Sequence, residues 1–164
     1  MTDHVSIIAP PLALAPQPQN PETDTVDADG WWPSLSIAEF RAMYRVTPET
    51  TAERVRAAIR TAMQTALIDL GEWGVLKRAE GHASLESVPA VQIDRVSHFV
   101  LCWHRAIGAL AKAELSETHR DYDATASGER KNDGLDDSII QLRRDAQHAI
   151  RDLKGVRRTV AELI

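Results

Sequence analysis

Two pairs of side chains in this sequence have a spacing that could hold a metal ion. His98 and Cys102 are four residues apart, and Asp145 and His148 are three residues apart. On a helix, each spacing places both members of a pair on one face, as a shared ligand site requires. No second cysteine accompanies the first pair, and a satisfied core position is the commoner role of such residues. The sequence therefore predicts no metal site.

A calcium loop and a catalytic centre are also poorly supported. Asp121 and Asp123 alternate like the first two ligands of a calcium loop, but position 125 is threonine and position 126 is not glycine. Serine, histidine and acidic residues are too scattered for a catalytic triad, and no glycine motif for phosphate binding is present. We therefore expect neither an enzyme nor a bound cofactor.

Length and composition indicate one folded domain with or without a tail. The chain has 164 residues, of which 43% are hydrophobic and 26% are charged. No apolar run approaches the roughly 20 residues that span a bilayer. The apolar stretch from Val5 to Leu14 contains two prolines and is preceded by no Lys or Arg, so it does not resemble a secretory signal. A single cysteine excludes an internal disulfide.

The net charge of −5 is confined to one end of the chain. Residues 1–33 contain five acidic residues and no Lys or Arg, whereas the other 131 residues hold 19 basic and 24 − 5 = 19 acidic groups. Mild overall acidity disfavours a nucleic-acid binder. From the residues alone, a small helical metal-binding module or a regulatory DNA-binding module stays open as an alternative to a structural protein.

Residues 1–33 are predicted to form an extended, proline-rich acidic arm. Six of the eight prolines lie there, and proline disfavours both helix and central strand. The alternative is an unstructured leader without a role. If the arm lies along a neighbouring subunit or partner, its anchors would be Ile7, Ile8, Leu12 and Leu14.

Trp31 and Trp32 lie side by side where this arm ends. Adjacent residues cannot share a helix face, so at least one ring is expected to contact something other than its own helix. We favour a hydrophobic cap on the folded domain, because tryptophan is rarely left in water. A contact with another subunit or partner is the alternative.

Residues 34–155 are predicted to form an all-α bundle of one short and three long helices. Ser36 and Glu39 fit a capping box, and a second one precedes a helix from Thr51 to Arg78. Apolar residues at spacings of three and four predict the buried faces. These residues are Ile37, Ala38, Phe40 and Tyr44; Val55, Ile59, Ala62, Ala66, Leu70 and Trp73; Val96, Phe99, Val100, Trp103, Ile107, Leu110, Ala111 and Leu115; and Ile139, Leu142, Ala146, Ala149, Ile150 and Leu153.

Several residues predict where these helices begin, bend and end. Gly71 and Gly74 are candidates for a bend in the second helix, which stops at the glycine of the 81–83 segment. Asp94 is a plausible N-cap for the third helix. The polar stretch 121–134 is predicted to be a long loop, so the fourth helix would begin near residue 135 and end at Gly155.

Residues 156–164 follow the last glycine and form an apolar terminus, which is unusual for a segment exposed to water. The segment could pack back on the bundle, or it could be an extended docking segment that adds to a partner's sheet or groove. The sequence leaves both open. The docking residues would be Val156, Arg157, Arg158, Thr159, Val160, Glu162, Leu163 and Ile164.

A set of short motifs in a fixed order resembles a known family. They are Trp31-Trp32-Pro33-Ser34-Leu35, Gly81-His82-Ala83, Val88-Pro89, Ala113-Glu114-Leu115, Arg120-Asp121-Tyr122-Asp123-Ala124-Thr125, Leu142-Arg143-Arg144-Asp145, Ala149-Ile150-Arg151-Asp152 and Arg158-Thr159-Val160-Ala161-Glu162-Leu163-Ile164. Together they are similar to the phage head completion protein (GPL) family of contractile-tailed temperate phages, over roughly residues 31–164.

The resemblance implies a structural virion protein, assembled in the bacterial host cytoplasm and located in the neck between head and tail. It implies a homo-oligomeric ring, expected to be dodecameric, that binds the portal protein after DNA packaging, stabilises the filled head and receives the next neck or tail-completion protein. Residues 156–164 would dock on the portal, the arm could reach the capsid protein, and DNA would pass the lumen without sequence-specific binding. No membrane and no cofactor are implied.

Overall fold

The computed structural model describes residues 24–123 and 129–156, with only the backbone between residues 119 and 136. In this part of the chain the fold is dominated by helices, as predicted. The helices are α1 (Ile37–Met43), α2 (Ala52–Ala79), α3 (His98–Asp123) and α4 (Glu129–Leu153), with a 3-10 turn η1 (Leu85–Ser87). Two short antiparallel pairs accompany them: β1 (Thr25–Val26) with β2 (Leu35–Ser36), and β3 (Gln92–Ile93) with β4 (Val96–Ser97).

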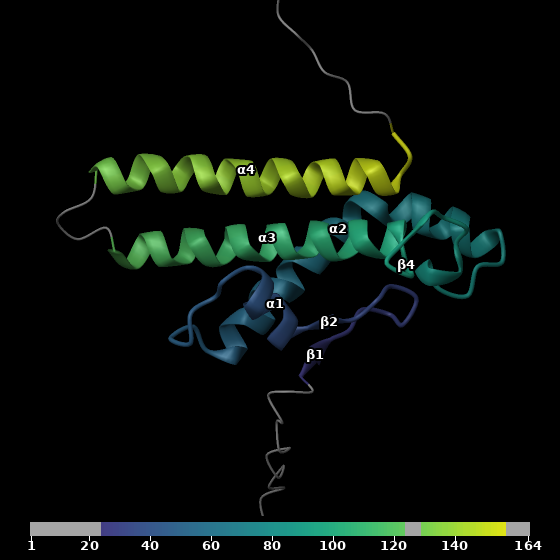
Figure 1. Ribbon diagram of the computed structural model, residues 1–164, viewed down its shortest axis with the longest axis horizontal. Coiled ribbons are helices and arrows are strands. Elements are labelled where there is room, and N and C mark those ends of the chain that lie inside the picture. Colours follow the sequence, from purple (N-terminus) through teal and green to yellow (C-terminus); the bar gives the residue numbers. More distant parts are fainter. Residues whose placement is uncertain (1–23, 124–128, 157–164) are drawn as a thin grey trace, which may run out of the picture.

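The helices α3 and α4 lie side by side as a long antiparallel pair, and α2 crosses α3 (Figure 1). The helix α1 and the β1–β2 pair lie on the side of α3 away from α4. Helix α3 is therefore central, and its buried residues Trp103, Ile107 and Ala111 are fully enclosed. None of the described helices has the length and apolar character needed to cross a membrane.

The starts of α1 and α2 are set by side-chain caps. The hydroxyl of Ser36 accepts a hydrogen bond from the Glu39 backbone N–H at 3.3 Å, which confirms the predicted cap. The hydroxyl of Thr51 accepts one from the Arg54 backbone N–H at 3.3 Å. Each bond satisfies a backbone donor that has no partner inside the helix.

Replacement of Thr51 by alanine is expected to lower the free energy of unfolding by about 1 kcal/mol, because the donor at the start of α2 loses its acceptor. Urea denaturation monitored by circular dichroism measures the effect. The matched control is Thr65→Ala in the exposed middle of the same helix, where the Thr65 hydroxyl only donates to the Thr61 carbonyl. Alanine favours helix there, so little loss is expected. Equal losses in the two variants would contradict a capping role for Thr51.

The predicted apolar stripes of α2, α3 and α4 form the core, although Trp73, Phe99 and Leu142 are only partly buried against it and one predicted residue lies outside it. In α2, Val55, Ile59, Ala66 and Leu70 are fully enclosed, and in α4 the last core residue, Leu153, is 1% exposed. Val96 was predicted to join the third stripe but is 37% exposed, because it lies in β4 and precedes α3.

The predicted N-cap role of Asp94 is wrong. Asp94 and Arg95 have φ of 51° and 64°, and they form the two-residue turn between β3 and β4. Left-handed conformations at both central positions give a turn whose twist matches an antiparallel hairpin. Helix α3 consequently begins at His98, four residues after Asp94. The backbone N–H of His98 donates to the Val91 carbonyl at 2.9 Å.

The prediction of a long loop over residues 121–134 is also wrong. Helix α3 continues to Asp123 and α4 begins at Glu129, so only residues 124–128 lie between them, outside the described residues. Polar residues are compatible with helix, and an isolated glycine inside a helix costs only about 1 kcal/mol. Packing of α4 along α3 outweighs that cost.

Residues 24–33, which the sequence analysis assigned to the arm, lie against the bundle in the structure. The Ile37 N–H donates to the Asp24 carbonyl at 3.0 Å, and the Thr25 carbonyl accepts from the Arg56 guanidinium at 3.0 Å. Arg56 also forms an ion pair with the Asp24 carboxylate. The proline pattern did not predict these long-range contacts, because they depend on a residue of α2.

Candidate interaction surface

An aromatic cluster ties the N-terminal segment to the helices. It consists of Trp31, Trp32, Trp73, Phe99 and Trp103. Trp32 stacks on Trp103 with ring centroids 4.6 Å apart, and the indole N–H of Trp103 donates to the Pro33 carbonyl at 2.9 Å. The neighbouring ring of Trp31 meets Trp32 edge to face at 4.8 Å. The cluster therefore couples residues 31–33 to α2 and α3.

Trp31 and Trp32 are only 7% and 4% exposed, which favours the cap interpretation of this pair. Little of either ring is left to contact a subunit or partner, so such a contact would require the cap to open.

The close approach of Trp32 also explains why residue 74 is a glycine. A Cβ atom at that position would lie 2.9 Å from the Trp32 ring, and α2 continues through Gly71 and Gly74 without interruption.

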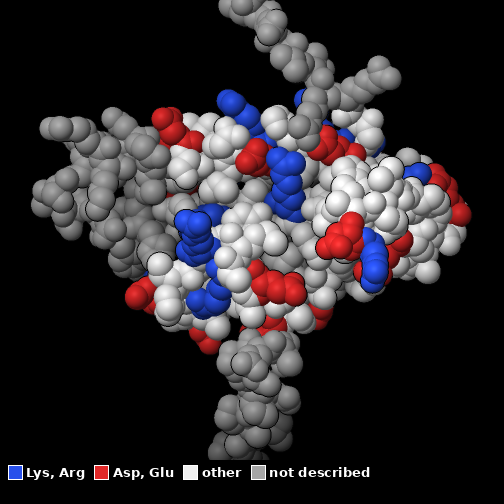
Figure 2. Space-filling model, in the orientation of Figure 1, with Lys and Arg blue, Asp and Glu red and all other residues white. Residues whose placement is uncertain are grey.

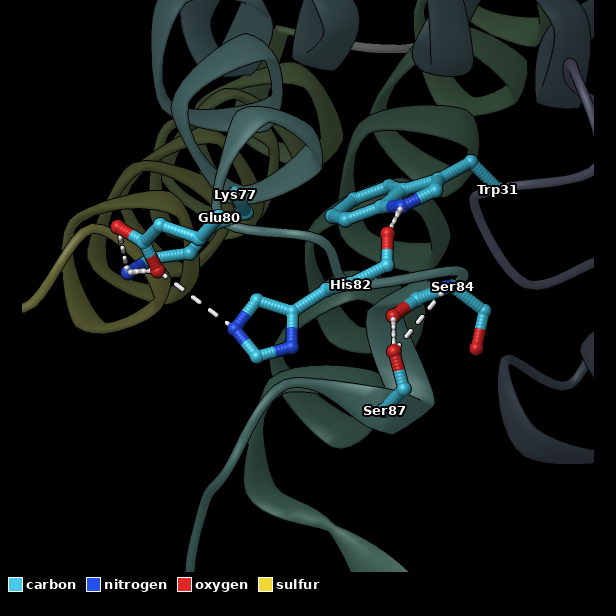
Figure 3. A network of polar contacts seen from close by, with 6 residues as sticks. All are labelled: Trp31, Lys77, Glu80, His82, Ser84 and Ser87. Atoms are coloured by element: carbon cyan, nitrogen blue, oxygen red, sulfur yellow. Dashed lines mark hydrogen bonds and ion pairs between the residues drawn. The ribbon is translucent and has the colours of Figure 1, made fainter.

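A polar network lies beside this cluster, at the end of α2 (Figure 3). The Lys77 ammonium donates to both Glu80 carboxylate oxygens at 3.0 and 2.8 Å, and the His82 ring lies 3.5 Å from the same carboxylate. The hydrogen bond from Lys77 holds the pKa of Glu80 below its ordinary value. The His82 carbonyl accepts the indole N–H of Trp31 at 2.9 Å. The network therefore fixes the chain where it leaves α2.

The same region forms a groove of about 400 Å³. We call it the terminal groove, because the end of α4 forms one of its sides. Its lining is apolar at Trp73, Val88, Pro89, Phe99 and Leu153, and charged or polar at Lys77, Glu80, His82, Lys154 and Gly155. Residues from four separate parts of the chain meet there. Their spacing in the sequence does not predict that they form a groove.

Two further surfaces expose large apolar side chains. On the outer side of α2, Ile68, Val75 and Leu76 are 83%, 65% and 62% exposed. Beside the β3–β4 turn, Val91 and Ile93 are 75% and 53% exposed. We refer to these as the α2 surface and the hairpin surface. The helical periodicity predicted neither surface. Ile68, Val75 and Leu76 lie off the apolar stripe of α2, and apolar residues at such positions are a sequence signal for an exposed apolar surface.

The four candidate metal ligands are not brought together. The Cys102 sulfur lies 3.5 Å from His98 Nε2, so this pair is satisfied internally. Asp145 instead accepts a hydrogen bond from Gln141 at 3.2 Å and pairs with Arg105 at 3.5 Å. Among the described residues, no group of three or more His, Cys, Asp or Glu side chains could hold a metal ion. Asp121 and Asp123 lie at the end of α3, not in a loop, and their side chains are outside the described part.

Charges of both signs are interspersed on the face shown in Figure 2. Exposed ion pairs such as Arg143 with Glu117, 2.7 Å apart, bridge α4 and α3. Exposed pairs of this kind contribute little to stability, typically about 0–1 kcal/mol. The visible face therefore offers no single-signed field like that of a dedicated nucleic-acid surface.

The described part of the chain is a helical module with exposed apolar side chains on the α2 surface and the hairpin surface and with a partly apolar groove. Residues 26–164 match the family model described as phage head completion protein (GPL). The chain belongs to this family, and it is a phage structural protein that functions in head completion. This membership agrees with the expectation of a structural role.

Two relatives support the assignment. The chain is 32% identical over 151 residues to the head completion/stabilization protein of Escherichia phage P2, covering 92% of this chain and 89% of that protein. It is 27% identical over 142 residues to the probable head completion/stabilization protein of Haemophilus phage HP1 (strain HP1c1), covering 85% and 92%. No solved structure matches the chain significantly.

Most predicted contact residues at the two ends lie outside the described residues. Val156 is the last described residue and is 48% exposed. The other predicted docking residues, in the range 157–164, and the predicted arm anchors Ile7, Ile8, Leu12 and Leu14 are not described. Their roles stay predictions.

Proposed function

We propose that this chain is the head-to-tail connector that completes the filled phage head. In this proposal, copies of the chain form a dodecameric ring on the portal protein after DNA packaging, in the neck of the virion. The ring stabilises the packaged head and presents the surface to which the next neck or tail-completion protein attaches. Residues 1–23 of the predicted arm contact the capsid protein or a neighbouring subunit.

One observation carries the portal contact. The family match continues through Ile164, although the helical core closes before that. Helix α4 ends at Leu153, Gly155 adopts φ of +71°, and the Val156 N–H donates to the Arg151 carbonyl at 3.0 Å. Because the described core is complete at this point, the shared apolar terminus is available for a partner. We assign that partner as the portal.

The exposed apolar surfaces support assembly into a ring. A ring of identical subunits requires a heterologous contact, in which two different patches of one subunit meet the complementary patches of its neighbours. The α2 surface and the hairpin surface are two such patches on one chain. The balanced charge of residues 34–164 suits a lumen through which DNA passes, because a strongly basic lumen would retain it.

The test is sedimentation of the full chain with purified portal rings. We expect the chain to be monomeric alone and to co-sediment with portal rings in a ratio of one chain per portal subunit. Electrophoretic mobility of duplex DNA at moderate salt is the accompanying measurement, and no shift is expected from the isolated chain. Absence of co-sedimentation at saturating chain concentration would rule the proposal out.

A further inference from the structure

The terminal groove is a concave, partly apolar site at the place where the described chain ends. Lys154 and Gly155 belong to its lining, and Val156 follows directly. We propose that, in the free protein, this groove binds the chain's own C-terminal segment, residues 157–164, and releases it when the portal binds. This inference rests on the proposed function for its second half, the release to the portal.

The segment reaches the groove without any rearrangement of the helices. Eight extended residues span at most about 26–29 Å, and the first of them follows Val156, which is next to the lining residue Gly155. Connection through the same chain also gives the segment an effective concentration in the millimolar range, which a separate partner rarely attains. An occupant from this chain is therefore favoured over one from solution.

The apolar lining matches the apolar residues of the segment. Trp73 and Phe99 pack edge to face with centroids 5.5 Å apart, and both are only partly buried in the described chain. The exposed parts of these two side chains would be covered by the aliphatic side chains of the segment, which are Val160, Leu163 and Ile164. Covering exposed apolar surface is favourable by about 25 cal/mol per Å².

The charged rim matches the charges of the segment. Lys77 and Lys154 lie on the groove and would attract the carboxylate of Glu162. Glu80, on the same rim, would attract Arg157 or Arg158, which follow Val156. These contacts are exposed, so they orient the segment and contribute less to its affinity than the apolar side chains do.

Self-docking would regulate assembly by competition. A segment held in the groove is not available to a partner, so the apparent affinity for the portal falls in proportion to the fraction of copies in which the segment is free. Copies that are not bound to a portal also keep this apolar segment covered. They would therefore not associate with one another before a portal is present. Binding to the portal would replace one set of apolar contacts by another.

Nuclear magnetic resonance of the full-length chain tests the docking directly. We expect nuclear Overhauser effects between the Leu163 methyl groups and the ring protons of Trp73 and Phe99. The methyl groups of Ile140, which is 57% exposed on α4, serve as the internal control and should show none to these rings. Absence of the Leu163 effects would overturn the inference, whatever the portal measurement shows.

A matched pair of variants tests the release. Pro89→Glu places a charge on an exposed residue of the groove, whereas Pro48→Glu makes the same change at an exposed site before α2. If the segment is docked in about nine copies in ten, Pro89→Glu should remove the Leu163 effects and raise portal affinity about tenfold. Pro48→Glu should change neither.

The outcomes separate the two proposals. Leu163 effects that persist in Pro89→Glu would contradict the assignment of the groove. If Pro89→Glu removes these effects but leaves portal affinity unchanged, release of residues 157–164 from the groove does not control assembly. Failure of the portal proposal would instead appear as absence of co-sedimentation of the full chain with portal rings, while the Leu163 effects in the full chain still report on docking.

Discussion

Deletion of residues 157–164 is expected to abolish co-sedimentation with portal rings while the remaining chain stays folded. The physical reason is that the described core closes before the deleted segment. Leu153 is the last core residue, at 1% exposure, and the backbone bonds around Gly155 end α4. The free energy of unfolding should fall by no more than about 1.4 kcal/mol, the contribution of a segment docked in about nine copies in ten, and this would shift the thermal midpoint by roughly 3–5 °C. Sedimentation and circular dichroism measure the two halves of this prediction.

Point variants in the full chain keep this prediction informative. Leu163→Asp should reproduce the loss of portal binding, because an apolar contact is replaced by a buried charge. Thr159→Ser, in the same segment, is the conservative control and should bind like the unaltered chain. Co-sedimentation of the truncated chain at the level of the full chain would show that another surface makes the portal contact.

Replacement of Trp103 by alanine is expected to lower the free energy of unfolding by about 3–5 kcal/mol. Trp103 is fully enclosed, stacks on Trp32 and donates its indole N–H to the Pro33 carbonyl. The change would therefore leave a cavity in the core and also free the segment that α3 holds through this ring. Total stabilities of about 5–15 kcal/mol are typical, so the loss would be a large share. Urea denaturation measures it.

Two companion variants separate the causes. Trp103→Phe retains an aromatic ring but removes the indole donor, so a smaller loss is expected, and this variant stays measurable if the alanine variant does not fold. Trp73→Ala, in the same cluster but only partly buried, should cost less than Trp103→Ala. A larger cost at Trp73 would contradict the central place of Trp103 in the core.

Local sequence patterns determined most of the helical structure. The apolar stripes of α2, α3 and α4 follow from the period of the helix itself, so residues such as Ile59, Ile107 and Ala146 could be placed in the core in advance. The caps at Ser36 and Thr51 and the stop at Gly155 are equally local, because each depends on contacts within a few residues. The family resemblance rested on such short motifs in order.

Tertiary structure decided what these patterns left open. The start of α4 at Glu129 depends on packing along α3, and the β3–β4 turn depends on left-handed conformations at Asp94 and Arg95, which their residue types do not demand. Gly74 was a candidate for a bend in α2, but the helix is continuous there, and the missing side chain leaves space for the Trp32 ring. In each case the deciding energy comes from a partner distant along the chain or from backbone geometry.

The interaction surface shows the same division. The sequence by itself identified an apolar C-terminal segment and a pair of tryptophans at the end of a proline-rich arm. Only the folded chain brings Trp73, Pro89, Phe99 and Lys154 into one groove beside that segment, and only it buries Trp31 and Trp32. A groove is formed by residues that are distant in the sequence and close in space. The periodicity of apolar residues along the chain does not predict which distant residues will be in contact.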